Sequence, residues 1–217
     1  MATVVTVAQQ KGGAGKTSVA AHLSICLAFD GAEGAPRPRV KLIDLDPQQS
    51  LTTWFRLREE LYGADDRLSL MPVSSGWRIA KEVEKARGEA DIVIIDSPPH
   101  AQDAMRTGIR AADLVVVPLQ LSPMDIWAAR PTFDMIAREQ RKALFVFNRV
   151  PQRARAAEAI AEALKREQLP IANAALGNRV VYSSSLMKGQ GVSEAEPRST
   201  AADEIRALAA EVMRRLQ

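Results

Sequence analysis

A short segment near the start of the chain, QKGGAGKTS at Gln10–Ser18, constrains the fold more than any other feature. Its small residues allow successive backbone N–H groups to turn inward around an anion such as phosphate. Thr3–Ala8, which precedes it, is a β-branched run typical of a buried strand. Ser18–Phe29, which follows it, has apolar residues at helical spacing. Strand, glycine loop and helix in this order predict a phosphate-binding loop.

The end of this loop matches the pattern G-x-x-x-x-G-K-[ST], although Gln10 stands where the first glycine would fall. Lys16 is placed to reach the β- and γ-phosphates of a nucleotide, and the Thr17 hydroxyl is placed to ligate Mg²⁺. The N-terminal end of the following helix adds a positive dipole. The predicted nucleotide-binding residues of the loop are Gly12, Gly13, Ala14, Gly15, Lys16, Thr17 and Ser18.

Strand-like and helical patterns alternate along the rest of the chain. Strands are expected at 40–43, 68–71, 91–95, 114–117, 143–147 and, more weakly, 170–172. Helices are expected at 51–61, 77–87, 101–111, 124–140, 154–167, 180–187 and 200–216. This alternation predicts an α/β fold with a mostly parallel, twisted sheet covered by helices on both faces. Ligands of such sheets bind at the carboxyl ends of the strands.

Carboxylates follow two of these strands. Asp44 and Asp46 occupy alternate positions at one strand end and so point to the same side, where they suit either Mg²⁺ binding or the orientation of a water. Asp96 closes the apolar strand Ile92–Ile95, an arrangement typical of a carboxylate that holds Mg²⁺ through water.

A second lysine in the loop, Lys11, distinguishes this segment from the ordinary pattern. Lys-Gly-Gly-Ala-Gly-Lys-Thr resembles the deviant Walker A motif of the ParA/MinD family of dimerising P-loop ATPases. The resemblance extends from Val4 to the last helix and implies one domain over residues 1–217, with ATP and Mg²⁺ as cofactors. It implies that Lys16 acts on the nucleotide of its own subunit and that Lys11 reaches the nucleotide of a partner subunit.

The resemblance also implies roles for other strand ends. Asp44-Leu45-Asp46-Pro47-Gln48 is similar to the family's switch segment, in which the second aspartate, here Asp46, takes part in hydrolysis and the first supports the Mg²⁺ region. Asp96-Ser97-Pro98-Pro99 matches the family's Asp-x-Pro-Pro. Asn148 falls where the family places an asparagine against adenine, and Pro118 belongs to another family-like nucleotide-binding segment.

The composition of the chain indicates which branches of the family it can belong to. The single cysteine, Cys26, excludes relatives that need paired or clustered cysteines for metal or iron–sulfur chemistry. No long apolar run is present, and the apolar stripe of the last helix is expected to dock on the core rather than to act as a membrane anchor. Residues 1–128 carry a net charge of −2 and residues 129–217 one of +5. This uneven charge has two interpretations. It favours an anionic partner such as DNA, or it reflects only the charged, solvated faces of surface helices.

These features are most similar to the small ParA-type partition or positioning ATPases. We therefore expect a cytoplasmic, nucleoid-associated ATPase that forms a homodimer on ATP binding and binds non-specific DNA. Its weak activity would be stimulated by a ParB-like or cargo-adaptor protein as it segregates DNA or positions a protein cargo. The alternative is a MinD-like membrane-surface or cellulose-synthesis-associated regulatory ATPase without DNA binding. Charge and position suggest these DNA contacts: Arg153, Arg155, Arg179, Lys188, Arg214 and Arg215.

Overall fold

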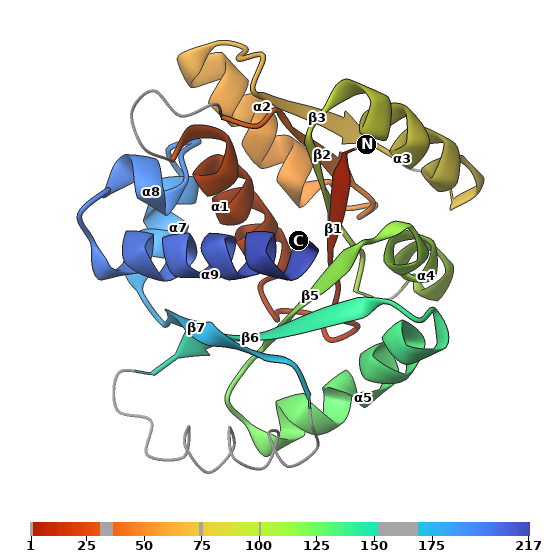
Figure 1. Ribbon diagram of the computed structural model, residues 1–217. Helices are drawn as coiled ribbons and strands as arrows, with labels where there is room; N and C mark the ends of the chain where they lie inside the picture. The colour runs from red at the N-terminus through yellow and green to blue at the C-terminus, as the bar shows by residue number, and fades with distance from the viewer. Residues whose placement is uncertain (1, 31–36, 74–75, 100, 152–168) are drawn as a thin grey trace.

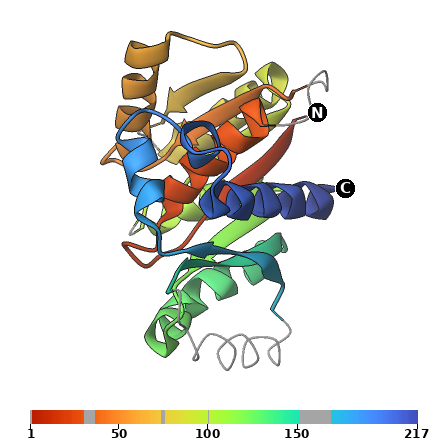
Figure 2. The ribbon, with the colours of Figure 1, turned by 90° about the vertical axis from the view of Figure 1, so that its left-hand side faces the viewer.

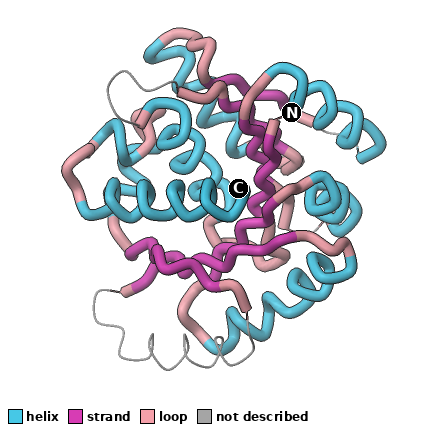
Figure 3. The backbone as a smooth tube through the Cα atoms, viewed as in Figure 1, coloured by secondary structure: helices cyan, strands magenta, loops and turns pink. Residues whose placement is uncertain are grey.

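Seven parallel strands form a single sheet at the centre of the protein (Figures 1 and 3). The computed structural model describes residues 2–30, 37–73, 76–99, 101–151 and 169–217. The strand order is β3-β2-β4-β1-β5-β6-β7. The strands are β1 (Thr3–Val7), β2 (Val40–Asp44), β3 (Leu68–Pro72), β4 (Ile92–Asp96), β5 (Leu114–Leu119), β6 (Lys142–Val150) and β7 (Ile171–Gly177).

The central strand β1 fixes where the predicted site lies. It pairs with β4 on one side and with β5 on the other, so that Val7 lies opposite both Asp96 and Val116. In the neighbouring pair, Asp44 of β2 lies opposite Asp96 of β4. The loop that follows β1 and the two strand-end aspartates therefore meet at one edge of the sheet.

Helices cover both faces of the sheet, as the sequence predicts. The two layers are visible in Figure 1, and Figure 2 shows the loop after β1 on the side opposite the C-terminal end of α9. One face carries α1 (Lys16–Phe29), α2 (Ser50–Tyr62), α7 (Val180–Leu186), α8 (Val192–Ala195) and α9 (Thr200–Leu216). The other face carries α3 (Gly76–Glu89), α4 (Gln102–Ala111) and α5 (Pro123–Arg138).

The predicted elements are confirmed within the described ranges, apart from small shifts at their ends. The helix expected at 154–167 lies outside the described residues. Two elements differ from expectation: β7 runs well beyond the short strand predicted at 170–172, and the four-residue helix α8 was not expected. β7 pairs irregularly with β6, and the buried Glu211 of α9 accepts hydrogen bonds from the backbone N–H groups of Asn173 and Ala174.

The apolar stripe of α9 packs against the sheet. Ile205, Leu208 and Val212 are all buried in the core cluster that includes α1. The expectation that this helix docks on the core is therefore confirmed. None of the helices in the described part of the chain is long and apolar enough to cross a bilayer.

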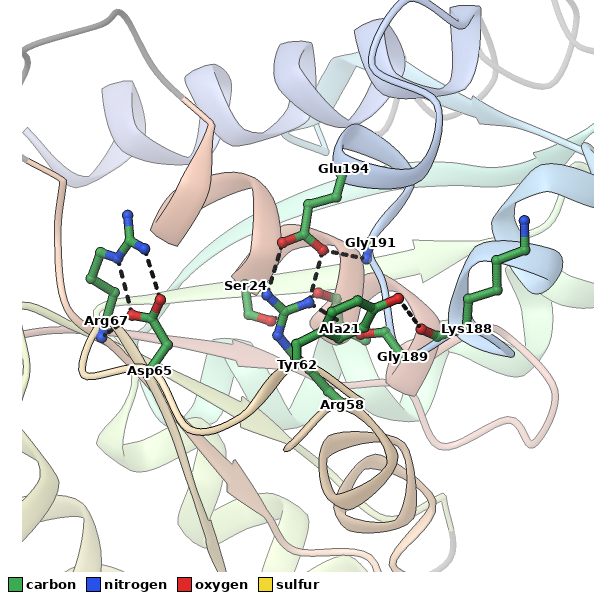
Figure 4. Close-up of polar contacts among 10 residues, drawn as sticks. All are labelled: Ala21, Ser24, Arg58, Tyr62, Asp65, Arg67, Lys188, Gly189, Gly191 and Glu194. Atoms are coloured by element: carbon green, nitrogen blue, oxygen red, sulfur yellow. Dashed lines mark hydrogen bonds and ion pairs between the residues drawn. The ribbon is translucent and has the colours of Figure 1, made fainter. Parts of the chain in front are cut away.

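A polar cluster fastens α2 to the connection between α7 and α8 (Figure 4). The guanidinium of Arg58 pairs with both carboxylate oxygens of Glu194 at 2.8 Å and donates to the Gly189 carbonyl. The Tyr62 hydroxyl donates to the Lys188 carbonyl. Because α2 begins directly after the Asp44–Gln49 segment, these contacts also fix the helix that follows the predicted switch.

His22 joins α1 to α7 and α8 from a fully buried position. Its Nδ1 accepts from the Val192 N–H at 3.1 Å, which leaves Nε2 as the donor toward the Tyr182 carbonyl at 3.0 Å. Burial lowers the pKa of His22 to about 4, against a smaller opposing effect of the Tyr182 carbonyl. The neutral ring is thus the form that the fold requires.

We predict that this histidine makes the fold sensitive to mild acid. The unfolded chain takes up the His22 proton near pH 6.5 but the folded chain does so only near pH 4, so stability falls as the pH drops through this window. The stability advantage of the parent over His22→Gln should shrink by up to about 3 kcal/mol between pH 7 and pH 4. Urea unfolding of both proteins across this range measures the difference, and a constant gap would contradict the assignment.

Candidate nucleotide-binding site

The phosphate loop is fixed at its two ends by different elements. Its last residues begin α1, with Gly15 at the N-cap in a left-handed conformation (φ 90°) and Lys16 as the first helical residue. Gly13 also has a positive φ of 75°. Both conformations are unfavourable for residues with a side chain, which explains the glycines at these positions.

Lys16, Thr17 and Asp96 meet beneath the loop. The Thr17 hydroxyl donates to Asp96 Oδ2 at 2.6 Å, and Asp96 is buried at the end of β4. The Lys16 side chain is also buried, and among the described residues its Nζ makes one long contact of 3.5 Å, to the Lys11 carbonyl. A buried ammonium with so little hydrogen bonding indicates a position prepared for an anion.

The electrostatics of this group are unusual. Desolvation lowers the pKa of Lys16, although the charges of Asp96 and Asp46 oppose the shift. Desolvation raises the pKa of Asp96 to about 7, opposed by the Thr17 hydrogen bond and the Lys16 charge and reinforced by Asp44. The carboxylates around Lys16 would repel a phosphate unless a divalent cation lay between them, because like charges in a poorly solvated site interact strongly.

The residues present fit Mg²⁺. Asp96 Oδ1 is buried and has no hydrogen-bond partner in the described part of the chain, so this carboxylate has an oxygen available to a cation or its water. The Thr17 hydroxyl lies beside it. In the described ranges, no three His, Cys, Asp or Glu side chains form a complete metal site by themselves. Mg²⁺ in such sites takes few protein ligands and completes its shell with phosphate oxygens and water.

Asp44 is held by hydrogen bonds at the end of β2. Its Oδ1 accepts from the Asp46 N–H, and its Oδ2 accepts from the N–H and the hydroxyl of Thr52 in α2. Both carboxylate oxygens are thus engaged in holding the start of α2. These contacts give Asp44 a structural role, and its support of the Mg²⁺ region stays a prediction. Asp46 is half-buried in the following turn, where its Oδ1 accepts from the Gln48 N–H.

A cavity of about 820 Å³ adjoins the loop on the face that carries α1. Its lining includes Gly15, Ser18 and Asn148 together with residues of α2 and α7. Asn148 lies against the loop itself, where its Nδ2 donates to the Ala14 carbonyl at 2.9 Å. Its predicted proximity to the nucleotide site is therefore supported by geometry. Pro118 is different: β5 continues to Leu119, so Pro118 is buried inside the strand opposite Val146 and does not line this cavity.

Lys11 points away from Lys16, toward α5. Its Nζ forms an ion pair of 2.5 Å with Asp125 Oδ1. Sequence reasoning missed Asp125, and it also missed Gln9 and Thr132, which form a buried hydrogen bond behind the loop. The only sequence signal for Asp125 is its place in the first turn after Ser122-Pro123, which indicates a helix start but not a partner for Lys11.

The residues predicted to contact DNA are dispersed. Arg179 pairs with Glu204 of α9, with two nitrogens at 2.7 and 3.0 Å, and its contact with DNA stays a prediction. Lys188 is exposed before α8, whereas Arg214 and Arg215 are exposed in the last turn of α9. Arg153 and Arg155 lie outside the described residues.

Comparison with known proteins places this site in a family. The family model described as the CobQ/CobB/MinD/ParA nucleotide binding domain matches residues 5–192. The chain therefore belongs to this family of nucleotide-binding proteins, and the resemblance seen in its loop is confirmed.

Two curated relatives illustrate the range of similarity. The maintenance of carboxysome distribution protein A of Halothiobacillus neapolitanus is 28% identical over 221 residues, which cover 98% of this chain and 97% of that protein. The sporulation initiation inhibitor protein Soj of Bacillus subtilis is 26% identical over 157 residues, which cover 55% of this chain and 59% of that protein.

Solved structures share the fold. The cell division ATPase MinD of Pyrococcus furiosus superposes with a TM-score of 0.80 at 17% identity, covering 99% of each chain. An aspartate-to-alanine variant of Cyanothece McdA, solved with ATP, superposes with a TM-score of 0.74 at 20% identity. The match covers 99% of this chain and 96% of the McdA chain. MinD of Pyrococcus horikoshii, solved with Mg-ADP, superposes with a TM-score of 0.77 at 18% identity. The match covers 98% of this chain and 96% of the MinD chain. The predicted α/β P-loop fold is thereby confirmed.

The contact between Gly15 and Asn148 allows a direct test of the loop geometry. A Cβ on Gly15 would lie 2.3 Å from Asn148 Nδ2, whereas a Cβ on Gly13 would have no neighbour within 4 Å. Gly13→Ala should cost roughly 1–2 kcal/mol for its left-handed backbone alone. Gly15→Ala should cost roughly 1–3 kcal/mol more, because it displaces the buried Asn148 amide. Chemical unfolding without nucleotide measures both, and equal losses would contradict this packing.

Proposed function

We propose that the chain is an ATP-dependent dimer-switch ATPase of the ParA type that positions a protein cargo or segregates DNA. The observation that carries the proposal is the contrast between its two loop lysines. Lys16 is buried above Asp96, whereas the Lys11 side chain is 38% exposed on the rim of the site. This contrast supports a role for Lys16 at the phosphates of its own subunit and a role for Lys11 at those of a partner subunit.

ATP and Mg²⁺ are the proposed cofactors. The loop amides and Lys16 would bind the phosphates, Thr17 and Asp96 would hold Mg²⁺, and Asn148 would adjoin the base. Mg²⁺ supplies charge neutralisation of the phosphates, which a loose phosphoryl-transfer transition state requires more than it requires a strong base. Asp46 would orient the attacking water, a role supported by its half-buried position and by its electrostatic effect on Lys16.

A second subunit would complete the site. Met124 and Trp127 on the first half of α5 are 66% and 69% exposed, and they flank the residue that binds Lys11. Large apolar side chains exposed beside a binding site are typical of a surface that another protein covers. Lys11 of each subunit would then add positive charge at the phosphates of the other, so that hydrolysis would depend on dimerisation.

Non-specific DNA and a ParB-like or cargo-adaptor protein are the proposed partners, in the cytoplasm at the nucleoid. The similarity over nearly the full length of a carboxysome distribution protein favours cargo positioning. The burial of the α9 stripe supports the expectation that this helix docks on the core rather than on a membrane. The proposed DNA contacts within the described residues are Arg179 and the exposed Lys188, Arg214 and Arg215, and Arg153 and Arg155 stay predictions.

The two lysines should fail in different ways. Lys16→Ala removes a charge-assisted phosphate contact and should abolish ATP binding. Lys11→Ala should retain ATP binding but lose hydrolysis and ATP-dependent dimerisation. Lys81→Ala, on an exposed position of α3, is the control. Equilibrium binding, phosphate release and sedimentation velocity give the three readouts, and normal hydrolysis by Lys11→Ala would disprove the trans role.

DNA binding should require ATP and decline with salt. If a dimer meets about four phosphates, the logarithm of its affinity should fall against the logarithm of salt concentration with a slope of roughly −3 to −4. Lys188→Glu should weaken binding to all sequences alike, and Lys81→Glu on the opposite face should not. Gel shifts with ATP, with ADP and without nucleotide test this, and the absence of an ATP-dependent shift would exclude the DNA-binding role.

A further inference from the structure

The first half of the phosphate loop is held by α5. The Thr132 hydroxyl of α5 donates to Gln9 Oε1 at 3.0 Å and accepts from the Gln10 N–H at 3.1 Å. The Lys11 N–H donates weakly to the same Gln9 oxygen at 3.4 Å. Gln9 and Thr132 are fully buried, so this part of the loop cannot shift without affecting α5.

The Lys11 side chain makes the outermost contact of this network. Its ammonium lies 2.5 Å from Asp125, whose side chain is only 9% exposed. At this distance the ammonium is fixed against the helix of its own subunit. A lysine bound in this way cannot also contact the phosphates of a second subunit, because it has one charged group at the end of one flexible stem.

We propose that Asp125 is a latch that holds Lys11 in its own subunit until a second copy of the chain binds. This inference rests on the proposed function, in which Lys11 acts in trans. The ion pair then competes with dimerisation and limits it when nucleotide is absent. Asp125 is a regulatory residue in this scheme, since it acts through Lys11 rather than on the nucleotide.

The surroundings of the pair suit reversible opening. Asp125 lies in the first turn of α5, after the N-cap residue Ser122, where the partial positive charge of the helix terminus stabilises a carboxylate. Its charge is therefore tolerated when Lys11 leaves. The Lys11 carbonyl also accepts the long bond from Lys16 Nζ. A phosphate that binds Lys16 would replace the Lys11 carbonyl as the acceptor for Lys16 Nζ. The backbone of Lys11 would then lose one of its hydrogen bonds.

The latch can be tested on the isolated subunit by lysine acetylation. In nucleotide-free protein, Asp125→Asn should raise the acetylation rate of Lys11 roughly five- to tenfold relative to the exposed Lys188, because the ammonium loses a partly buried partner. Asp134→Asn, the same change at an exposed position of α5, should leave that rate unchanged. A parent-like Lys11 rate in Asp125→Asn overturns the proposal. Asp125→Ser is the second variant if the first does not fold.

Sedimentation velocity with Mg-ATP then tests the consequence for assembly. Asp125→Asn should lower the protein concentration at half-dimerisation roughly five- to tenfold, and this effect should vanish in a Lys11→Ala background. A higher concentration would show that Asp125 positions Lys11 for the partner and would overturn the latch. If the parent and every variant stay monomeric, the proposed function fails, while the acetylation rates still decide whether Asp125 restrains Lys11.

Discussion

A buried lysine and a buried aspartate, placed together at the carboxyl edge of the sheet, impose the main constraint on this structure. Lys16 and Asp96 both lose hydration, and the parallel register of β1 and β4 brings them to the same point. Neither charge is fully compensated: Lys16 has one long hydrogen bond, and Asp96 Oδ1 has none. These two buried charges destabilise the empty site, and a bound phosphate and cation would compensate them.

The elements around this pair are arranged to hold it rigidly. Asp44 anchors α2 behind it, and Asn148 braces the loop from β6. The Arg58–Glu194 contacts then tie α2 to α8. Any movement of the Asp46 turn would therefore be transmitted to the layer that carries α7 and α9. The arrangement couples the site to an outer surface through direct contacts between packed elements.

The sequence predicts the parts of the molecule that depend on local pattern. The loop, the apolar strands and the fold class follow from residue type and spacing, and α9 was placed at its observed limits because its stripe is regular. β7 was underestimated because Ala172–Ala175 contains no β-branched residues, and the strand relies on Glu211, distant in sequence, for two of its N–H groups. The surroundings of Asp44, Pro118 and Arg179 cannot be predicted from the sequence for the same reason. They are set by Thr52, by the length of β5 and by Glu204.

The position of Asp125 shows that the tertiary structure gives information on function that the sequence motif lacks. The motif identifies two lysines in one loop but gives no reason for them to behave differently. The structure separates them: Lys16 faces a buried carboxylate beneath the loop, and Lys11 faces another carboxylate on α5. Lys11 forms an ion pair with Asp125, and Lys16 feels the charge of Asp96, an aspartate of a different element 29 positions earlier in the sequence. A phosphate that competes with these carboxylates would act on both lysines, which gives nucleotide binding a physical route to the surface where a second subunit would bind.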